Sequence, residues 1–146
     1  MRHEAKAILR NTSVSVHPDV FAVVSIEKSH WPNVLEDKSV GPSGVAPFMI
    51  FSDPYEVTLI LNRTDFENIR PAIGDSRVEA NFRMLTFTVE LDFNVVGFMA
   101  EISRILAEAN ISICALSSFS RDHLLIHQDD LARALNALGP HVEELC

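Results

Sequence analysis

The sequence predicts an α+β fold in which one β-α-β-β-α-β unit occurs twice, first in a degenerate form and then complete. Strand-like and helix-like hydrophobic patterns follow one another in that order in the second half of the chain. Most of the same order recurs in the first half. The first half has prolines and glycines where the second half has its first helix. We therefore expect a degenerate unit at residues 1–82 and a complete unit at residues 83–146.

The first half contains most elements of this unit. Its patterns predict strands at 21–27, 48–52 and 56–61, a helix at 64–70 and a strand at 76–81. Thr64 and Glu67 have the spacing of a capping box at the start of the helix, and Pro71 and Gly74 end it. Residues 5–16 are expected to add an extra strand at the edge of this unit.

The second half contains every element of the unit. Its patterns predict strands at 84–91, 111–117 and 123–127, helices at 95–109 and 131–138, and a short last strand at 141–145. Asn94 is a candidate N-cap for the first helix, and Asn110 is a candidate left-handed residue at its end. Asp129 begins the second helix, and Gly139-Pro140 end it.

The two halves align with each other around their second and third strands. Residues 51–66 match residues 119–131 once three residues are removed from the turn, so that LILNRTDF lies over LLIHQDDL. An internal repeat explains the alignment, and chance similarity of two amphipathic strands is the alternative. The halves differ at residues 29–47, where three prolines and two glycines exclude a long helix. The first unit is therefore expected to lack its first helix.

The composition is that of a folded, acidic protein. Hydrophobic residues make up 47% and charged residues 22% of the 146 residues, and the net charge is −8. The acidic charge argues against nucleic acid or an anionic membrane as a partner. No apolar stretch has the length of a membrane span, and the N-terminus lacks the pattern of a signal peptide, so we expect a cytoplasmic protein. Cys114 and Cys146 lack the spacing of a zinc site or a disulfide framework, and Cys114 is expected to be buried.

No catalytic motif is present in the sequence. The chain contains no GxSxG, Walker, GxGxxG or HExxH pattern, and Ser117-Ser118 lie beside no evident base. His123, His127 and His141 are close enough in sequence to imitate a metal-binding group, but exposed histidines at a sheet edge are the favoured explanation. We therefore expect neither catalysis nor a metal or other cofactor.

A first candidate binding segment is the turn that leads into the predicted helix at 95–109. The first N–H groups of a helix have no partner within the helix, and with the helix dipole they attract a small anion such as a carboxylate. Asp92 is suited to bind a ligand's ammonium group, and Gly97 allows a ligand to approach the backbone closely. The alternative is that Asp92 and Asn94 only cap the helix.

A second candidate binding segment is the turn at residues 117–122. Its side chains are two hydroxyls at Ser117 and Ser118, the aromatic ring of Phe119 and the carboxylate of Asp122. Such a set is able to recognise a small zwitterion, with Asp122 facing an ammonium or guanidinium group. An ordinary polar turn between two strands is the alternative.

At these residues the sequence resembles an ACT domain, and in particular the small tandem-ACT proteins that resemble the arginine sensors of the mTOR pathway. The resemblance is carried by Leu91-Asp92-Phe93, Gly97, Ile111-Ser112-Ile113, Ser117-Ser118-Phe119 and Asp122. Two positions depart from the family pattern: Ser118 replaces a common threonine, and Asn110 replaces a glycine before the second strand, which asparagine imitates in left-handed geometry.

The resemblance implies a ferredoxin-like fold, a free amino acid as the ligand, and a homodimer built by side-by-side pairing of sheets. ACT domains commonly bind an effector where the loop after the first strand meets the strands of a neighbouring unit. The ligand-binding residues implied here are Asp92, Phe93, Asn94, Val95, Val96, Gly97, Ile113, Ser117, Ser118, Phe119 and Asp122. The first unit lacks the helix whose N-terminus would bind a ligand, so its own loop is not expected to be a site.

Three functions are therefore compared. The favoured one is an amino-acid-binding regulatory or sensor module without catalytic activity. The alternative is a structural or dimerisation module of the same fold that binds no ligand. A small enzyme such as an acyl-phosphate hydrolase ranks last, because that chemistry needs an arginine in a phosphate-binding loop and residues 84–103 contain none.

Overall fold

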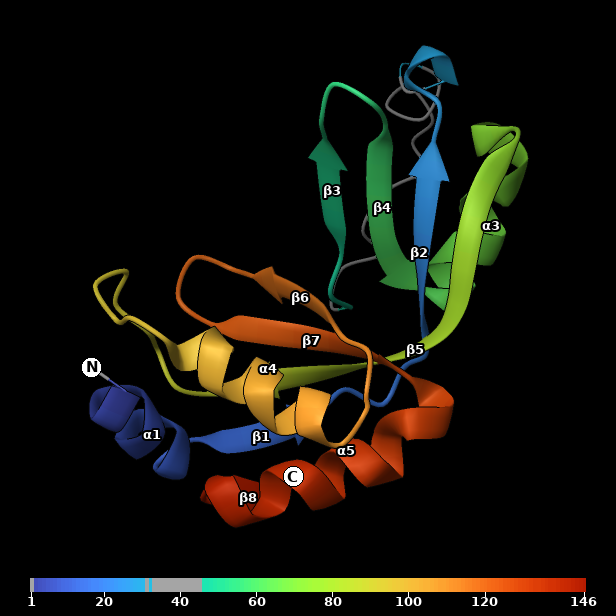
Figure 1. The fold of residues 1–146 in the computed structure, drawn as a ribbon. Helices are drawn as coiled ribbons and strands as arrows, with labels where there is room; N and C mark the ends of the chain where they lie inside the picture. The colour runs from blue at the N-terminus through green and yellow to red at the C-terminus, as the bar shows by residue number, and fades with distance from the viewer. Residues whose placement is uncertain (1, 31, 33–45) are drawn as a thin grey trace. The chain divides into compact units, whose positions relative to one another are not determined.

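The computed structural model describes residues 2–30, 32 and 46–146, and it confirms the predicted α+β fold. The chain divides into two compact units (Figure 1). One unit, here called the terminal unit, comprises residues 1–18 and 82–146. The other, here called the middle unit, comprises residues 19–81. Each unit is described by itself.

The middle unit contains the strands and the helix that the sequence predicts for the first half. Its elements are β2 (Phe21–Ile26), β3 (Met49–Ser52), β4 (Val57–Asn62), α3 (Arg63–Ile73) and the first half of β5 (Ser76–Phe87). The strands lie in the order β3-β4-β2-β5, and β4 is antiparallel to both β3 and β2. Apolar side chains of α3 pack on one face of this sheet, against alternate residues of β2 and β4 such as Val24 and Leu59. This is the ferredoxin-like strand order.

Helix α3 begins and ends differently from the prediction. The side chain of Asn62 accepts a hydrogen bond from the backbone N–H of Asp65 and is the N-cap, so the predicted capping box of Thr64 and Glu67 is wrong. The helix also continues past Pro71 and ends at Gly74, which has a φ of 63°. Pro71 lies in the last turn of the helix and does not end it.

The predicted absence of a helix between the first two strands lies largely outside the described residues. After β2 the structure describes a short 3-10 helix, η1 (Lys28–His30). The description resumes fully at residue 46, just before β3.

The terminal unit contains the predicted complete β-α-β-β-α-β order together with an N-terminal segment. Its elements are α1 (Arg2–Arg10), β1 (Ser13–Val16), the second half of β5, α4 (Phe98–Glu108), β6 (Cys114–Ser117), β7 (Asp122–His127), η2 (Gln128–Asp130), α5 (Leu131–Leu138), η3 (Gly139–His141) and β8 (Glu144–Leu145). The strands lie in the order β6-β7-β5-β1-β8. Both α4 and α5 contribute to one core with Leu85, Leu124 and Ile126 of the sheet.

The N-terminal segment corrects the predicted domain boundaries. Residues 5–16 were expected to form an edge strand of the first unit, but they contain most of α1 and all of β1, and both belong to the terminal unit. Strand β1 pairs antiparallel with β5, and Val14 is fully buried. The short last strand β8 pairs parallel with β1 instead of with β5. The units therefore consist of 1–18 with 82–146 and of 19–81, instead of 1–82 and 83–146.

Two predicted strands merge and two predicted elements begin later than expected. The strands predicted at 76–81 and 84–91 form the single strand β5, in which Asn81 has a φ of 68°. The helix predicted from Val95 begins at Phe98, because Gly97 takes the N-cap position. Strand β6 begins at Cys114 instead of residue 111. Helix α5 has the predicted range, but Asp129 does not begin it, because Asp129 lies in η2 and Asp130 is at the N-cap position. Asn110 has the predicted left-handed conformation with a φ of 60°.

No helix among the described residues has both the length and the apolar character needed to cross a membrane.

Candidate functional site

A pocket of about 320 Å³ lies in the terminal unit between the loop before α4 and the β6–β7 turn. It brings together the two segments that the sequence singles out. The predicted site residues that line it are Asp92, Phe93, Val95, Gly97, Ser117, Ser118, Phe119 and Asp122. Ser120 and Arg121, which lie within the predicted turn at 117–122, also line it, as do Leu91, Phe98, Met99 and Ala100, which were not predicted as site residues.

The loop before α4 is held by a turn at Asp92. The carboxylate Oδ1 of Asp92 accepts a hydrogen bond from the backbone N–H of Asn94 at 3.1 Å. Its carbonyl oxygen accepts from the N–H of Val95 at 3.0 Å. Asn94 is therefore part of this turn and is not the N-cap. Gly97, with a φ of 89°, takes the N-cap position and supplies no side-chain cap.

The N-terminus of α4 has unpaired donors. The first N–H that bonds within the helix is that of Glu101, which donates to the carbonyl of Gly97 at 3.0 Å. Among the described residues, the N–H groups of Phe98, Met99 and Ala100 have no acceptor. These three residues line the pocket. With the positive end of the helix dipole they form a place that favours a small anion.

The β6–β7 turn forms the opposite wall. The N–H of Ser118 donates to the carbonyl of Arg121 at 2.9 Å, and the Ser118 hydroxyl donates to the same oxygen at 3.2 Å. The N–H of Leu91 donates to the carbonyl of Ser120 at 2.7 Å. This last bond ties the two walls of the pocket to each other.

Acidic side chains stand on both walls. Asp92 is exposed on the first wall. On the second wall the hydroxyl of Ser117 donates to Oδ1 of Asp122 at 2.5 Å. The other carboxylate oxygen of Asp122 has no hydrogen-bond partner among the described residues. The pocket therefore offers carboxylates for a cation as well as helix N–H groups for an anion.

Two aromatic rings that line the same pocket contact each other. The rings of Phe93 and Phe119 meet edge to face, with centroids 5.2 Å apart. Their exposed fractions are 78% and 84%, which is unusual for phenylalanine. Exposed aromatic rings beside polar groups are typical of a surface that binds a ligand or a partner.

Arg121 lies in the predicted turn at 117–122, but no role of its own was predicted for it. Its Nε donates to the carbonyl of Thr88 at 3.0 Å, and its guanidinium forms an ion pair with Glu90 at 3.2 Å. These contacts hold the turn to the segment that follows β5. The available signal was its position inside the predicted turn at 117–122. Its partners are about 30 residues away in the sequence, so the pairing itself left no local pattern.

His123 supports the turn from the sheet. Its ring Nδ1 lies 2.8 Å from the hydroxyl of Thr86, and its Nε2 lies 3.0 Å from the hydroxyl of Ser118. Burial lowers the pKa of His123; Arg121 also lowers it, while Asp122 acts in the opposite direction. The imidazole is therefore favoured in its neutral form, in which it bridges two hydroxyls.

The remaining predicted site residues do not line the pocket. Asn94 is exposed in the turn, and the side chain of Val96 is also exposed. Ile113 packs against the hydrophobic core of the terminal unit. The structure brings together eight of the predicted residues and leaves these three outside the pocket lining.

The histidines and cysteines form no metal site in the part of the chain that the structure describes. Strand β7 lies between β5 and β6, so His123 and His127 are not edge residues as expected. His127 instead accepts a hydrogen bond from the N–H of Asp129. Cys114 is half-buried, and burial raises the pKa of its thiol.

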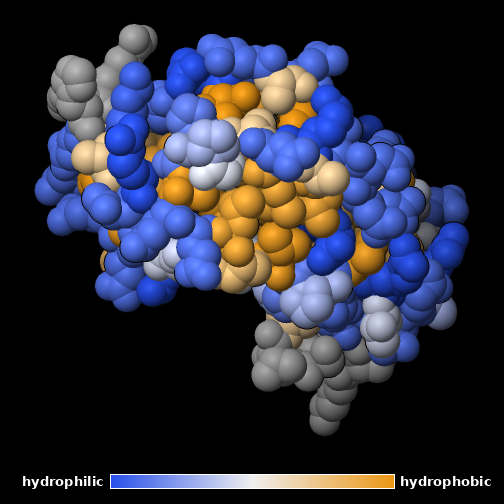
Figure 2. Space-filling model, turned by 90° about the horizontal axis from the view of Figure 1, so that it is seen from below, coloured by the Kyte–Doolittle hydropathy of each residue, from blue (hydrophilic) through white to orange (hydrophobic). Residues whose placement is uncertain are grey.

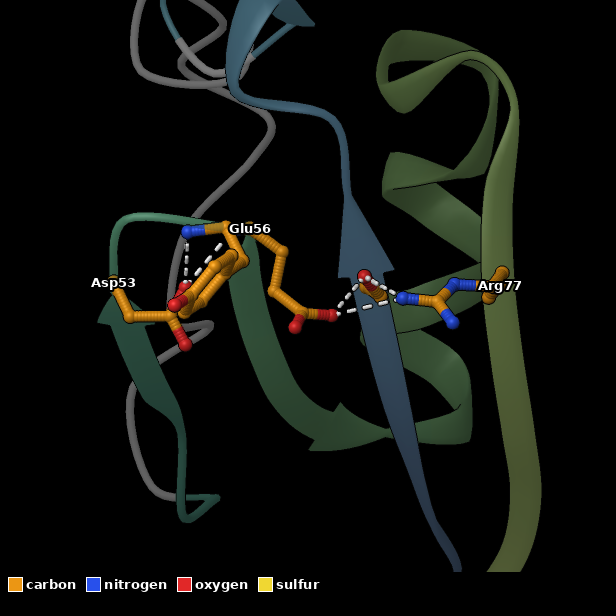
Figure 3. A network of polar contacts seen from close by, with 5 residues as sticks. Asp53, Glu56 and Arg77 are labelled. Atoms are coloured by element: carbon orange, nitrogen blue, oxygen red, sulfur yellow. Dashed lines mark hydrogen bonds and ion pairs between the residues drawn. The ribbon is translucent and has the colours of Figure 1, made fainter.

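The middle unit has a polar pocket of about 370 Å³ near the ends of β2 and β5. Arg77 reaches across β2 to Glu56 at 3.1 Å, and Ser25 donates to the same Glu56 oxygen at 2.6 Å (Figure 3). Asp53 accepts from the N–H groups of Glu56 and Tyr55, and these bonds lower its pKa. The one arginine of this pocket is thus paired with Glu56.

Comparison with known proteins identifies the domain to which the terminal-unit pocket belongs. Residues 77–139 match the profile of the ACT domain. These residues include both walls of the pocket. No curated protein matches the chain significantly.

Solved structures share the fold over most of the chain. An X-ray structure of a protein from Agobacterium tumefaciens has a TM-score of 0.70 at 17% identity and covers 93% of this chain and 92% of its own. A protein of unknown function from Vibrio cholerae, described as a possible transport protein, has a TM-score of 0.66 at 20% identity, with coverages of 94% and 95%.

The ligand-free regulatory subunit of aspartate kinase from Thermus thermophilus has a TM-score of 0.64 at 14% identity, with coverages of 91% and 98%. At these identities the likeness shows the fold alone.

Proposed function

We propose that this protein is an amino-acid-binding regulatory or sensor module without catalytic activity, and that its site is the pocket of the terminal unit. The observation that carries the proposal is the open N-terminus of α4, which lies in the same pocket as the carboxylates of Asp92 and Asp122. An α-amino acid carries an ammonium and a carboxylate group on the same carbon atom. One small pocket that offers both partners is suited to a zwitterion.

The ligand's carboxylate binds the N–H groups of Phe98, Met99 and Ala100. Hydrogen bonds between such donors and an ionised acceptor contribute about 1.5–3 kcal/mol each. The ammonium group binds Asp122 or Asp92. The ligand's side chain lies against Phe93 and Phe119, whose exposed rings bury apolar surface when it is bound. Asn94, Val96 and Ile113 shape the loop and the core behind the site.

We further propose that the protein is a cytoplasmic homodimer and that its two units are tandem ACT copies. The order β6-β7-β5 in the terminal unit repeats the order β3-β4-β2 in the middle unit, which supports an internal repeat, although β1 lies between β5 and the last strand β8. An apolar area gathers on the face seen from below in Figure 2. Large exposed apolar areas favour association. A second copy that covers Phe93 and Phe119 would also close the pocket from solvent.

Calorimetric titration of the full chain with each of the twenty amino acids tests this function. We expect saturable binding of one amino acid or of one chemical group of them, arginine included among the candidates. Asp122→Ala is expected to weaken binding at least tenfold, because it removes the carboxylate on the second wall. Asp129→Ala is the matched control, since Asp129 is exposed in η2 and does not line the pocket. The absence of heat and of any thermal shift with all twenty would contradict the proposal.

The second candidate is a dimerisation module that binds no ligand. The exposed, paired rings of Phe93 and Phe119 favour it, because such a pair also suits a protein contact. Sedimentation velocity of the wild type and of the double variant Phe93→Ser/Phe119→Ser measures the oligomeric state and distinguishes the binding module from the dimerisation module. A ligand-independent dimer that the double variant converts to a monomer, together with no amino-acid binding, would favour the dimerisation module.

A further inference from the structure

A small cavity of about 160 Å³ in the terminal unit is surrounded by basic side chains. It lies where α1, α4 and η3 meet, and its lining residues are Lys6, Leu9, Arg10, Glu101, Arg104 and His141. We call it the basic cavity. Its volume holds several water molecules or a small oxyanion, since one water takes up about 30 Å³ in the liquid.

The lining of this cavity is basic, whereas the protein as a whole is acidic. The chain has a net charge of −8 with only 12 lysines and arginines, yet three of them line this one cavity. With the histidine neutral, three cations face one carboxylate, so the lining carries a net charge of +2. A local charge of this sign on an acidic protein attracts an anion.

The carboxylate of Glu101 is already paired. Glu101 is 8% exposed, and Arg104 donates to both of its oxygens, at 2.5 Å through Nη2 and at 3.4 Å through Nε. Arg104 also pairs with Glu108 at 3.0 Å, outside the cavity lining. The pKa of Glu101 is lowered chiefly by the hydrogen bond from Arg104, and nearby positive charge, that of Lys6 included, lowers it further.

Lys6 and Arg10 have no such partner. Neither side chain forms a hydrogen bond or an ion pair within the described part of the chain. They stand four residues apart on α1, which places them on one face of the helix, where like charges repel. The C-terminal end of α1 favours Arg10, and Glu101 is the one carboxylate that lines the cavity together with Lys6. An anion between these groups would remove the repulsion.

We propose that the basic cavity binds a phosphate group, either free or carried as the ester of a small molecule. A phosphate anion complements the positive charge that Lys6 and Arg10 bring to the lining. The guanidinium of Arg10 offers two parallel donors to phosphate oxygens, and the ammonium of Lys6 offers a compact charge. The imidazole of His141 adds a further donor. This site is separate from the amino-acid pocket and does not depend on it.

Calorimetry on the full chain tests the proposal with three probes: inorganic phosphate, pyrophosphate and glycerol 3-phosphate. Sodium chloride of equal ionic strength is the reference. Saturable binding of at least one probe is expected at millimolar concentration or below. The probe that binds more tightly identifies the form of phosphate that the cavity takes. Tighter binding of glycerol 3-phosphate than of inorganic phosphate indicates a phosphate ester, and the reverse order indicates the free ion.

Lys6→Gln/Arg10→Gln is expected to weaken binding at least tenfold. Both side chains are exposed, so the fold should tolerate the change, as thermal unfolding will check. Lys6→Arg/Arg10→Lys keeps both charges and should retain binding within a few-fold. Arg70→Gln removes a charge from an exposed site in the middle unit and should leave binding unchanged. The proposal is overturned if no probe binds saturably, or if Arg70→Gln weakens binding as much as the double variant.

Discussion

Gly97 is the residue on which the geometry of the pocket depends most directly. It has a φ of 89°, and a Cβ placed there would meet only the Cβ of Ala5 at 3.9 Å, an ordinary contact. Space is therefore available, and the cost of a side chain comes from the backbone conformation, about 1–2 kcal/mol. We expect Gly97→Ala to lower the free energy of unfolding in urea by about that amount and to weaken amino-acid binding.

Gly139→Ala is the matched control for this substitution. Gly139 has a right-handed conformation at the end of α5, and a Cβ there would lie 3.6 Å from Leu145. This replacement should leave stability unchanged or raise it by up to about 1 kcal/mol. An equal loss of stability in both variants would show that the left-handed conformation of Gly97 is not the cause.

Glu101 gives a pH-dependent prediction at the residue scale. Its pKa is lowered below the ordinary 4.5, chiefly by the hydrogen bond from Arg104. A carboxyl group with a lowered pKa stabilises the folded state above its ordinary pKa, and this stabilisation is lost as pH falls through the folded-state pKa. Glu101→Gln should therefore be less stable than wild type by about 1 kcal/mol at pH 7. The difference should shrink below pH 4.5.

Urea unfolding of both proteins between pH 3 and pH 7 measures this difference. Glu108→Gln is the control, because its pair with the same arginine is largely exposed and contributes little. A stability difference for Glu101→Gln that stays constant down to pH 3 would be inconsistent with the ion pair as its source.

At the scale of elements, the N-terminus of α4 carries the binding proposal. Proline is tolerated in the first turn of a helix, but it removes one N–H donor. Ala100 is exposed and is the third residue of α4. We expect Ala100→Pro to keep the fold and to weaken amino-acid binding at least fivefold in calorimetry, because one of three donors is lost.

Ala132→Pro introduces the same change into the first turn of α5, at another exposed alanine. Its effect on thermal unfolding should be similar, whereas amino-acid binding should remain at the wild-type level. Equal loss of binding in the two variants would mean that general destabilisation, and not the missing donor, explains the effect of Ala100→Pro.

Elements whose signals are local were predictable from the sequence. The bounds of α5 follow from its leucine and alanine spacing and from Gly139 at its end. The start of α4 was predicted three residues too early, because Val95 and Val96 continue the apolar spacing, whereas the backbone at Gly97 sets the boundary. Helix α1 was missed although Ala5 and Leu9, four residues apart, are both 1% exposed and give a helical signal.

The candidate site was predictable to a similar degree. Polar residues in the two turns identified both walls, because turn chemistry is local. The free N–H groups of Phe98, Met99 and Ala100 could be predicted only from the correct first residue of α4, which the sequence pattern did not give. The role of Arg121 could not be predicted, because its partners Thr88 and Glu90 follow β5 and are distant in sequence. The pairing of β8 with β1 is likewise a contact between the two ends of the chain, and no local pattern specifies it.

At the scale of the whole molecule, the connectivity of the units gives a further prediction. Leu9 and Val14 belong to the core of the terminal unit, and β1 separates β5 from β8. A fragment of residues 82–146 should therefore fail to unfold cooperatively, since it lacks a central strand. His17 donates to the carbonyl of Met84 at 2.9 Å, so the chain ends at 18 and 82 lie close together.

Residues 1–18 joined by a short glycine-serine linker to residues 82–146 should restore cooperative thermal unfolding. Circular dichroism measures the thermal unfolding transition of the 82–146 fragment and of the linked protein, and the two transitions are compared. Cooperative unfolding of the 82–146 fragment alone would instead support the complete unit at 83–146 that the sequence predicts.

An amino acid in this pocket is proposed to bind with its carboxylate on the N-terminus of α4. Proton–nitrogen NMR of the full chain, titrated with each amino acid, reports on each backbone N–H and so observes this contact itself. We expect the amino acid that binds to cause its largest amide shifts at Phe98, Met99 and Ala100, with smaller shifts in the turn at 117–122. Binding that leaves these three amides unshifted, or the absence of any shift with all twenty amino acids, would rule this contact out.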